Sequence, residues 1–125
     1  MVKLLALDYG SARTGVAVSD PTGTIARPLT IVEAVGTAGG FERLLGVIAE
    51  EQPEAIVVGL PLTLRGEHGA QADETAVFVE RLRVAVAVPV ETYDERFTSV
   101  IAGGDDALAA AHLLSGYLEW RSTRS

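Results

Sequence analysis

Residues 4–19 read LLALDYGSARTGVAVS, and this stretch decides the fold class because it indicates two strands joined by a short turn. Apolar side chains run almost without interruption before Asp8 and again over residues 15–19. Such short runs, bounded by Gly and Asp, are typical of strands that are buried on both faces. The first strand is expected over residues 2–8, which places Asp8 at its carboxyl end, on the rim of a sheet.

Three further segments have the composition of strands. Residues 55–59 and 88–93 are short, rich in Val and Ile, and bounded by Gly or Pro, and residues 28–33 match this pattern less closely. Together with the first two strands they predict a five-stranded sheet.

Three other segments follow the helical period. Apolar residues recur at i, i+3, i+4 and i+7 over residues 41–48, and a second stripe covers residues 75–86. Pro53 and Pro89 end these two helices. A last helix is expected from near Asp105 towards Trp120, with an apolar stripe built mainly from Ala and Leu.

The order of these elements predicts the architecture. Three strands come first without an intervening helix, which indicates an antiparallel meander, and the later strands alternate with helices, which indicates parallel pairing with crossovers. The expected fold is a mixed five-stranded α/β sheet flanked by helices, an RNase H-like arrangement. The chain has 125 residues, the length of one domain, and no linker divides it, so residues 1–125 are expected to form a single domain.

Composition excludes several classes of protein. Of the residues, 48% are hydrophobic, which is enough for a core, but no run approaches the length of about 18 apolar residues that a membrane span needs. No segment reads as a signal peptide, so a cytoplasmic location without membrane attachment is expected. The absence of cysteine excludes disulfides, zinc–thiolate sites and cysteine nucleophiles.

The charge balance is acidic. Ten basic residues stand against 17 acidic ones, giving a formal net charge of −7, which argues against a domain whose only task is to grip phosphate backbones. Nine of the ten basic residues are Arg, however, and Arg suits bidentate contact with phosphate. An acidic excess also fits a cation site built from carboxylates.

The turn after Asp8 carries the first candidate site. Gly10 and Gly15 allow a tight turn and let a phosphate approach the backbone N–H groups. Two chemistries need this arrangement: a carboxylate that holds Mg²⁺ beside a phosphodiester, and a hairpin that cradles nucleotide phosphates. A third reading is structural, with the Asp side chain bonding to the backbone of its own turn.

Two further acidic pairs follow at the ends of elements. Asp94 and Glu95 come after the last predicted strand, and because strand side chains alternate, at most one of them can join Asp8. Asp105 and Asp106 open the last helix, where one can cap the helix while the other projects into a site. Each pair alone has an ordinary structural explanation, but three carboxylate positions at element ends form the oxygen-rich surroundings that Mg²⁺ or Mn²⁺ requires.

These motifs, taken together, resemble a known family. The segments are residues 6–10 (ALDYG), 15–20 (GVAVSD), 58–61 (VGLP, with Gly66 and Gln71 downstream), 94–98 (DERFT) and 106–110 (DALAA). In this order they are similar to the bacterial YqgF-type family of pre-16S rRNA nucleases and Holliday-junction resolvases. The resemblance runs from residue 4 to about residue 119, essentially the whole chain.

The resemblance implies an RNase H-like nuclease that cleaves phosphodiester bonds in structured nucleic acid, as in 5′-end processing of pre-16S rRNA or resolution of branched DNA. It makes Asp8, Glu95 and Asp106 the catalytic ligands of Mg²⁺ or Mn²⁺, in a site of two ions, with Asp94 and Asp105 as substitutes. The resemblance also makes nucleic acid the binding partner, and it leaves open whether the chain forms a homodimer.

The remaining predicted residues concern the grip on nucleic acid. Arg13, Arg65, Arg96 and Thr98 are expected to contact the bound strand, and Gly10, Gly15 and Gly59 to let phosphate or backbone approach closely. In one place the chain departs from the family, whose members usually carry a longer stretch, often with a basic loop, between the acidic strand-end motif and the last helix. Here only residues 98–105 stand between them.

Two other functions are compatible with the same residues. Asp-x-Gly-Ser followed by Arg-x-Gly also resembles the phosphate loop of actin-like and sugar-kinase ATPases, although those proteins need two such domains around a nucleotide. The other alternative is an adaptor that binds nucleic acid or the ribosome and keeps the fold without the chemistry.

Overall fold

The computed structural model describes residues 3–20, 25–60, 70–94 and 106–124. The elements, in chain order, are β1 (Leu4–Asp8), β2 (Arg13–Ser19), β3 (Ala26–Glu33), α1 (Ala38–Glu51), β4 (Ala55–Leu60), α2 (Ala70–Ala85), β5 (Val90–Asp94) and α3 (Asp106–Arg124). All eight predicted elements are confirmed, with bounds that shift by a few residues. No helix in these ranges is long and apolar enough to cross a membrane.

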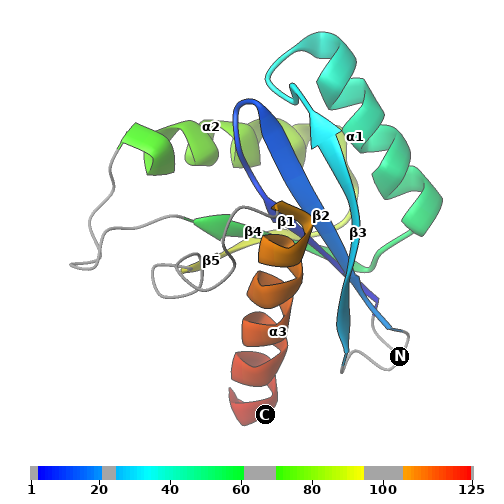
Figure 1. Cartoon of the computed structure of the whole chain (residues 1–125), viewed down its shortest axis with the longest axis vertical. Helices are drawn as coiled ribbons and strands as arrows, with labels where there is room; N and C mark the ends of the chain where they lie inside the picture. The colour runs from blue at the N-terminus through cyan, green and yellow to red at the C-terminus, as the bar shows by residue number, and fades with distance from the viewer. Residues whose placement is uncertain (1–2, 21–24, 61–69, 95–105, 125) are drawn as a thin grey trace.

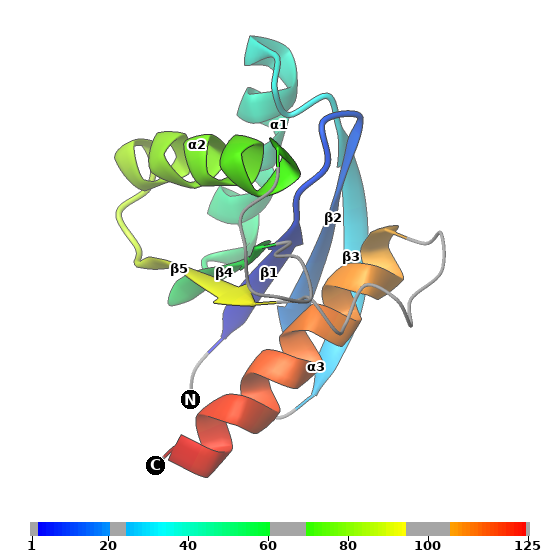
Figure 2. The same ribbon diagram turned by 90° about the vertical axis from the view of Figure 1, so that its left-hand side faces the viewer.

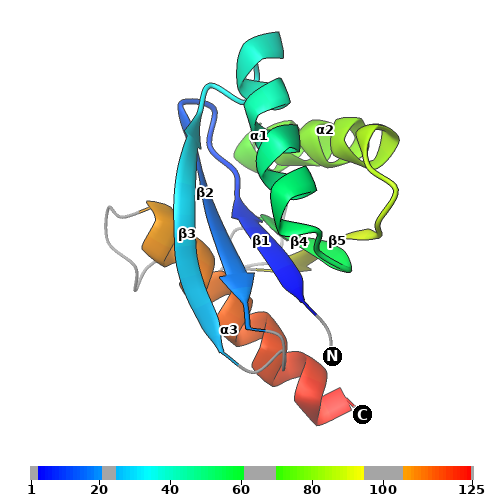
Figure 3. The same cartoon turned by 90° about the vertical axis from the view of Figure 1, so that its right-hand side faces the viewer.

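The strands form one mixed sheet in the order β3-β2-β1-β4-β5. The first three pair antiparallel, whereas β1 with β4 and β4 with β5 pair parallel. Helices α1 and α2 cover one face of the sheet, and α3 crosses the opposite face (Figures 1, 2 and 3). This is the meander-then-crossover architecture that the element order predicts.

The central strand β1 is buried on both faces, and its side chains alternate between two cores. Leu5 and Leu7 pack with α1 and α2, while Leu4 and Ala6 pack with α3, and all four are at most 1% exposed. The alternation explains why the sequence of β1 is a continuous apolar run rather than an alternating one. It also fixes the face on which each residue at the end of β1 emerges.

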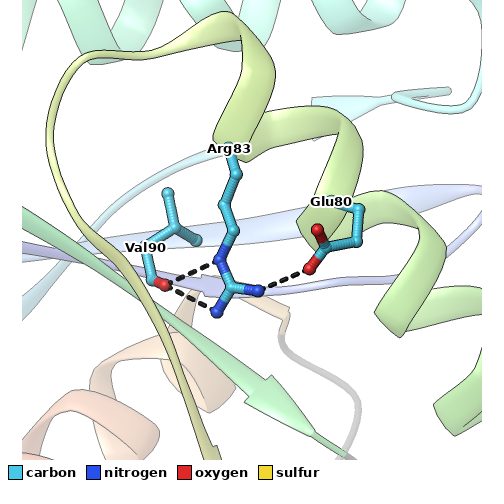
Figure 4. Close-up of polar contacts among 3 residues, drawn as sticks. All are labelled: Glu80, Arg83 and Val90. Atoms are coloured by element: carbon cyan, nitrogen blue, oxygen red, sulfur yellow. Dashed lines mark hydrogen bonds and ion pairs between the residues drawn. The ribbon is translucent and has the colours of Figure 1, made fainter.

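The free edge of β5 is held by an arginine from α2. The Nε and Nη2 atoms of Arg83 donate to the carbonyl oxygen of Val90 at 3.2 and 2.9 Å, and Nη1 donates to the carboxylate of Glu80 (Figure 4). The preceding carbonyl, that of Pro89, accepts from Ile56 of β4, so the carbonyl of Val90 points away from β4. Arg83 therefore satisfies an edge carbonyl and fixes where β5 begins.

Candidate functional site

Asp8 ends β1 on the face of the sheet that α3 covers. Leu4 and Ala6 pack with α3, and alternation along the strand puts Asp8 on the same face, half-buried. Because β1, β4 and β5 run parallel, their carboxyl ends all lie at the same end of the strands, on one rim of the sheet. The predicted position of Asp8, at a strand end on the rim, is confirmed.

Two glycines flank Asp8 on the neighbouring strands. Gly15 of β2 is the direct partner of Asp8 in the antiparallel ladder, and Gly59 of β4 follows Val58, the partner of Leu7. Neighbouring strands lie only about 4.8 Å apart, so side chains at these two positions would crowd the carboxylate. Because both positions are glycine, the two neighbouring strands place no side chain beside Asp8 there. The sequence predicts Gly15 as the first residue of the second strand, whereas the structure places it two residues inside β2.

The turn between β1 and β2 is held by close backbone packing. The buried hydroxyl of Thr14 donates to the carbonyl oxygen of Gly10 at 3.3 Å and lies 3.4 Å from its nitrogen. A Cβ on Gly10 would lie 2.4 Å from the carbonyl oxygen of Arg13, which backbone atoms cannot accommodate without shifting. The carbonyl of Ala12 accepts from the N–H of Ala34, which ties the turn to the end of β3. Gly10 is therefore required for the turn itself.

A polar cleft of about 490 Å³ lies beside this turn, next to α2. It is lined by Tyr9, Gly10, Ser11, Ala12, Arg13, Gln71 and Glu74. Tyr9 follows Asp8 and packs in the core shared with α1 and α2, so the cleft and the Asp8 carboxylate lie on opposite faces of the same rim. Two kinds of surface, an acidic position and a polar cleft, thus meet at the β1–β2 turn.

Tyr9 connects the cleft to α2. Its ring stacks on Phe78 with centroids 4.6 Å apart, and its hydroxyl donates to a carboxylate oxygen of Glu74 at 3.0 Å. Burial raises the pKa of the Tyr9 phenol, and the hydrogen bond to Glu74 and the negative charge of that carboxylate raise it further. The phenol therefore stays protonated and acts as the donor to Glu74.

The structure describes only part of the predicted metal centre. Asp94 is the last residue of β5 and Asp106 the first of α3, but their side chains are not among those described. Glu95 and Asp105 lie outside the described residues, as do the predicted nucleic-acid contacts Arg65, Arg96 and Thr98. Within the described part of the chain, no three His, Asp or Glu side chains gather as a metal site would require. The convergence of Asp8, Glu95 and Asp106 remains a prediction.

Five of the seven residues that line the cleft were not predicted as functional, among them Tyr9, Gln71 and Glu74. Tyr9 enters the sequence analysis only within the family motif at residues 6–10 and Gln71 only downstream of the motif at residues 58–61, while Glu74 was assigned no role. Their i, i+3 spacing places Gln71 and Glu74 on one face of α2. Nothing in the sequence indicates that this face meets the β1–β2 turn, because the contact depends on how α2 packs.

Solved structures share this fold. The Thermus thermophilus RuvC structure in complex with a Holliday junction superposes with a TM-score of 0.59 at 22% identity, covering 100% of this chain and 98% of that one. The Fowlpox virus resolvase, solved with Holliday junction DNA, gives a TM-score of 0.60 at 12% identity, covering 97% and 99%. These matches show that the chain shares the fold of these structures, the RNase H-like fold that the sequence predicts.

Sequence comparison gives the family. Residues 2–120 match the family model described as "RuvX: Holliday junction resolvase", and the chain belongs to this family. The relatives in Roseiflexus sp. and Desulforudis audaxviator, both named "Putative pre-16S rRNA nuclease", are 45% and 35% identical to it. The first alignment covers 80% of this chain and 71% of the relative, and the second covers 98% and 97%. The family is one of hydrolytic nucleases, as the resemblance predicted.

The comparison also bears on the length of the chain. The alignment with the Desulforudis relative spans 137 positions, more than the 125 residues of this chain, so that relative carries residues with no counterpart here. The chain is therefore shorter than this relative within the aligned region, and the shortened connection before the last helix stays a prediction.

Proposed function

We propose that this chain is an endonuclease that uses divalent metal ions to cleave structured nucleic acid, with Asp8 as the central metal ligand. The observation that carries this proposal is the row formed by Gly15, Asp8 and Gly59 on three adjacent strands. A half-buried carboxylate at a strand end, with glycine at the neighbouring position of each adjacent strand, suits a site that holds a cation beside a phosphate. The names of the relatives make precursor 16S rRNA a substrate to test, and the description of the family model makes branched DNA another. We propose the cytoplasm as the place of action.

Asp8 needs acidic partners, and the strand pairing supports Glu95 as one of them. Tyr93 of β5 pairs with Gly59 and contacts Tyr117 of α3, so it lies on the same face as Asp8. Side chains return to the same face every second residue, which favours Glu95 over Asp94. Asp106 opens α3, the helix that covers this face, and this supports Asp106 over Asp105.

Oxygen ligands from three carboxyl groups fit Mg²⁺ or Mn²⁺, and we propose two ions. Bound ions of this kind lower the pKa of a water and stabilise the leaving oxygen of the phosphodiester. The residues of the chain hold the ions and position the phosphate over the turn. Because a four-way junction has two strands to cut, a homodimer with two equivalent sites is the assembly that we propose for that substrate.

Cleavage by the purified protein tests the proposal directly. The substrates are a four-way DNA junction and a precursor 16S rRNA fragment, each incubated with Mn²⁺, with Mg²⁺ and with EDTA. We expect internal cleavage of at least one substrate that depends on the metal and does not need ATP. Tight binding without cleavage under either metal would identify an adaptor instead, and the nuclease proposal would then be wrong.

Arg13 is the described basic residue best placed to contact a bound strand. It is exposed, begins β2 and lines the cleft beside the turn. We expect Arg13→Ala to weaken binding of unrelated sequences to a similar extent, since phosphate contacts position a substrate without reading it. The slope of log affinity against log salt concentration should fall by about one unit for one lost phosphate contact.

The matched control is Arg27→Ala. Arg27 is equally exposed but lies near the far end of β2, opposite Val18. Its removal should leave affinity and salt slope unchanged. Equal effects of the two substitutions would show that Arg13 acts only through the net charge of the protein, and not through a contact.

A further inference from the structure

The polar cleft beside α2 has features that metal-dependent cleavage does not explain. Tyr9, which forms part of its lining, comes directly after Asp8, so the cleft begins one residue from the proposed metal ligand and on the other face of the rim. A nucleic-acid strand that passes Asp8 must therefore run close to this cleft. The proposed metal site at Asp8 assigns no role to the side chains of Gln71 and Glu74, which line the cleft from α2.

The cleft has two chemically different sides. The turn contributes the Arg13 guanidinium and the backbone of residues 10–12, whereas α2 contributes an amide and a carboxylate, those of Gln71 and Glu74. A phosphate is attracted by the first side and repelled by the Glu74 carboxylate on the second. A nucleotide in the cleft is thus oriented, with its phosphate towards the turn and its base towards α2.

Glu74 restricts which base fits. An ionised carboxylate only accepts hydrogen bonds, and one oxygen of Glu74 already accepts from the hydroxyl of Tyr9, which fixes the carboxylate in place. Carboxylates pair with the exocyclic amino group of cytosine, and an amide such as that of Gln71 can both donate and accept. Uracil and thymine carry a carbonyl group at this position. A carbonyl oxygen and a carboxylate are both acceptors, so no hydrogen bond could form between them.

We propose that this cleft is a subsite for one nucleotide of the bound strand, in which Glu74, supported by Gln71, selects a base that carries an exocyclic amino group. The proposal rests on the proposed function, because it requires that the protein bind nucleic acid. It adds a preference for base identity to a site that otherwise contacts only backbone.

Stem-loops with one fixed stem and a six-nucleotide loop test this preference. The loop is all cytosine or all uracil in RNA, and all cytosine or all thymine in DNA, and binding is measured by fluorescence anisotropy in EDTA so that cleavage plays no part. Cytosine differs from uracil at the amino position that Glu74 would read. We expect the parent protein to prefer the cytosine loop by about tenfold, the ratio that one good base contact provides.

The test variant is Glu74→Gln, with Glu50→Gln as its control. A glutamine can still accept from Tyr9, and Glu74 is exposed, so the fold should survive, which a thermal melt checks. Because the amide can also donate, the preference for cytosine should fall to about twofold or less. Glu50 is exposed on α1 and its replacement removes the same charge outside the cleft, so the tenfold preference should persist.

The outcomes separate the two proposals. Tight binding with equal affinity for both loops, or a preference that Glu74→Gln leaves unchanged, overturns the subsite and leaves the proposed nuclease intact. Loss of the preference in both variants also overturns it, since charge alone would then be responsible. Failure to bind any of the stem-loops overturns the subsite, whereas the proposed function is overturned only if neither the four-way junction nor the precursor rRNA is cleaved with metal.

Discussion

Replacement of Asp8 by Asn is expected to abolish cleavage while the fold remains intact. Asn keeps the size of the side chain but removes the charge that would hold the proposed metal ions at the end of β1. A metal site contributes several kcal/mol to stabilisation of the transition state, so a loss of about 4 kcal/mol lowers the rate on the order of a thousandfold. Single-turnover cleavage with Mn²⁺, at saturating protein, measures this loss.

The control for this substitution is Asp73→Asn. Asp73 is exposed in the first turn of α2 and does not line the cleft, so its replacement removes one carboxylate without touching the proposed metal site. The only expected cost is the favourable interaction with the helix dipole, about 0.3–1 kcal/mol of stability. An Asp8→Asn protein that melts like the parent and cuts at the parent rate would show that the mechanism is not centred on this carboxylate.

The architecture could be predicted because local patterns and tertiary structure agree in this chain. Apolar runs of strand length gave the five strands, and Pro53 and Pro89 marked where helices could not continue. The main difference is at the start of β2, which begins at Arg13 rather than Gly15 because Arg13 and Thr14 continue the ladder with β3, opposite Glu33 and Val32. An exposed Arg followed by a Thr does not look like a strand until its partner strand is known.

The sequence predicts the location of a site residue only where its position along a strand or helix fixes that location in the fold. The position of Asp8 on the rim was predicted correctly because it follows directly from where the first strand ends. The cleft formed by Tyr9, Gln71 and Glu74 was not found, because residues more than 60 positions apart meet there through the packing of α2. The hydrogen bond between Tyr9 and Glu74 and the stacking of Tyr9 on Phe78 are the contacts that create it.

Phe78→Ala is accordingly expected to be strongly destabilising and to disturb the turn that carries the site. Phe78 is 4% exposed, stacks on Tyr9 and meets the ring of Phe41 edge-on with centroids 6.4 Å apart. Truncation of a buried Phe typically costs about 3–5 kcal/mol, through lost burial and the cavity that remains. Urea denaturation followed by circular dichroism should show a lower midpoint with an unchanged slope.

The adjacent residue provides the control, since Val77 is 69% exposed and Val77→Ala should change the free energy of unfolding by no more than about 0.5 kcal/mol.

The Phe78→Ala protein should also lose part of its affinity for nucleic acid below its melting temperature. Tyr9 would then lack the ring that supports it, although its hydroxyl could still reach Glu74. The Phe78→Ala substitution could lower stability as expected while the protein still binds nucleic acid with the parent affinity and base preference. That result would show that the β1–β2 turn keeps its shape without the stacking of Tyr9 on Phe78. The packing of Tyr9 on α2 would then contribute to stability alone.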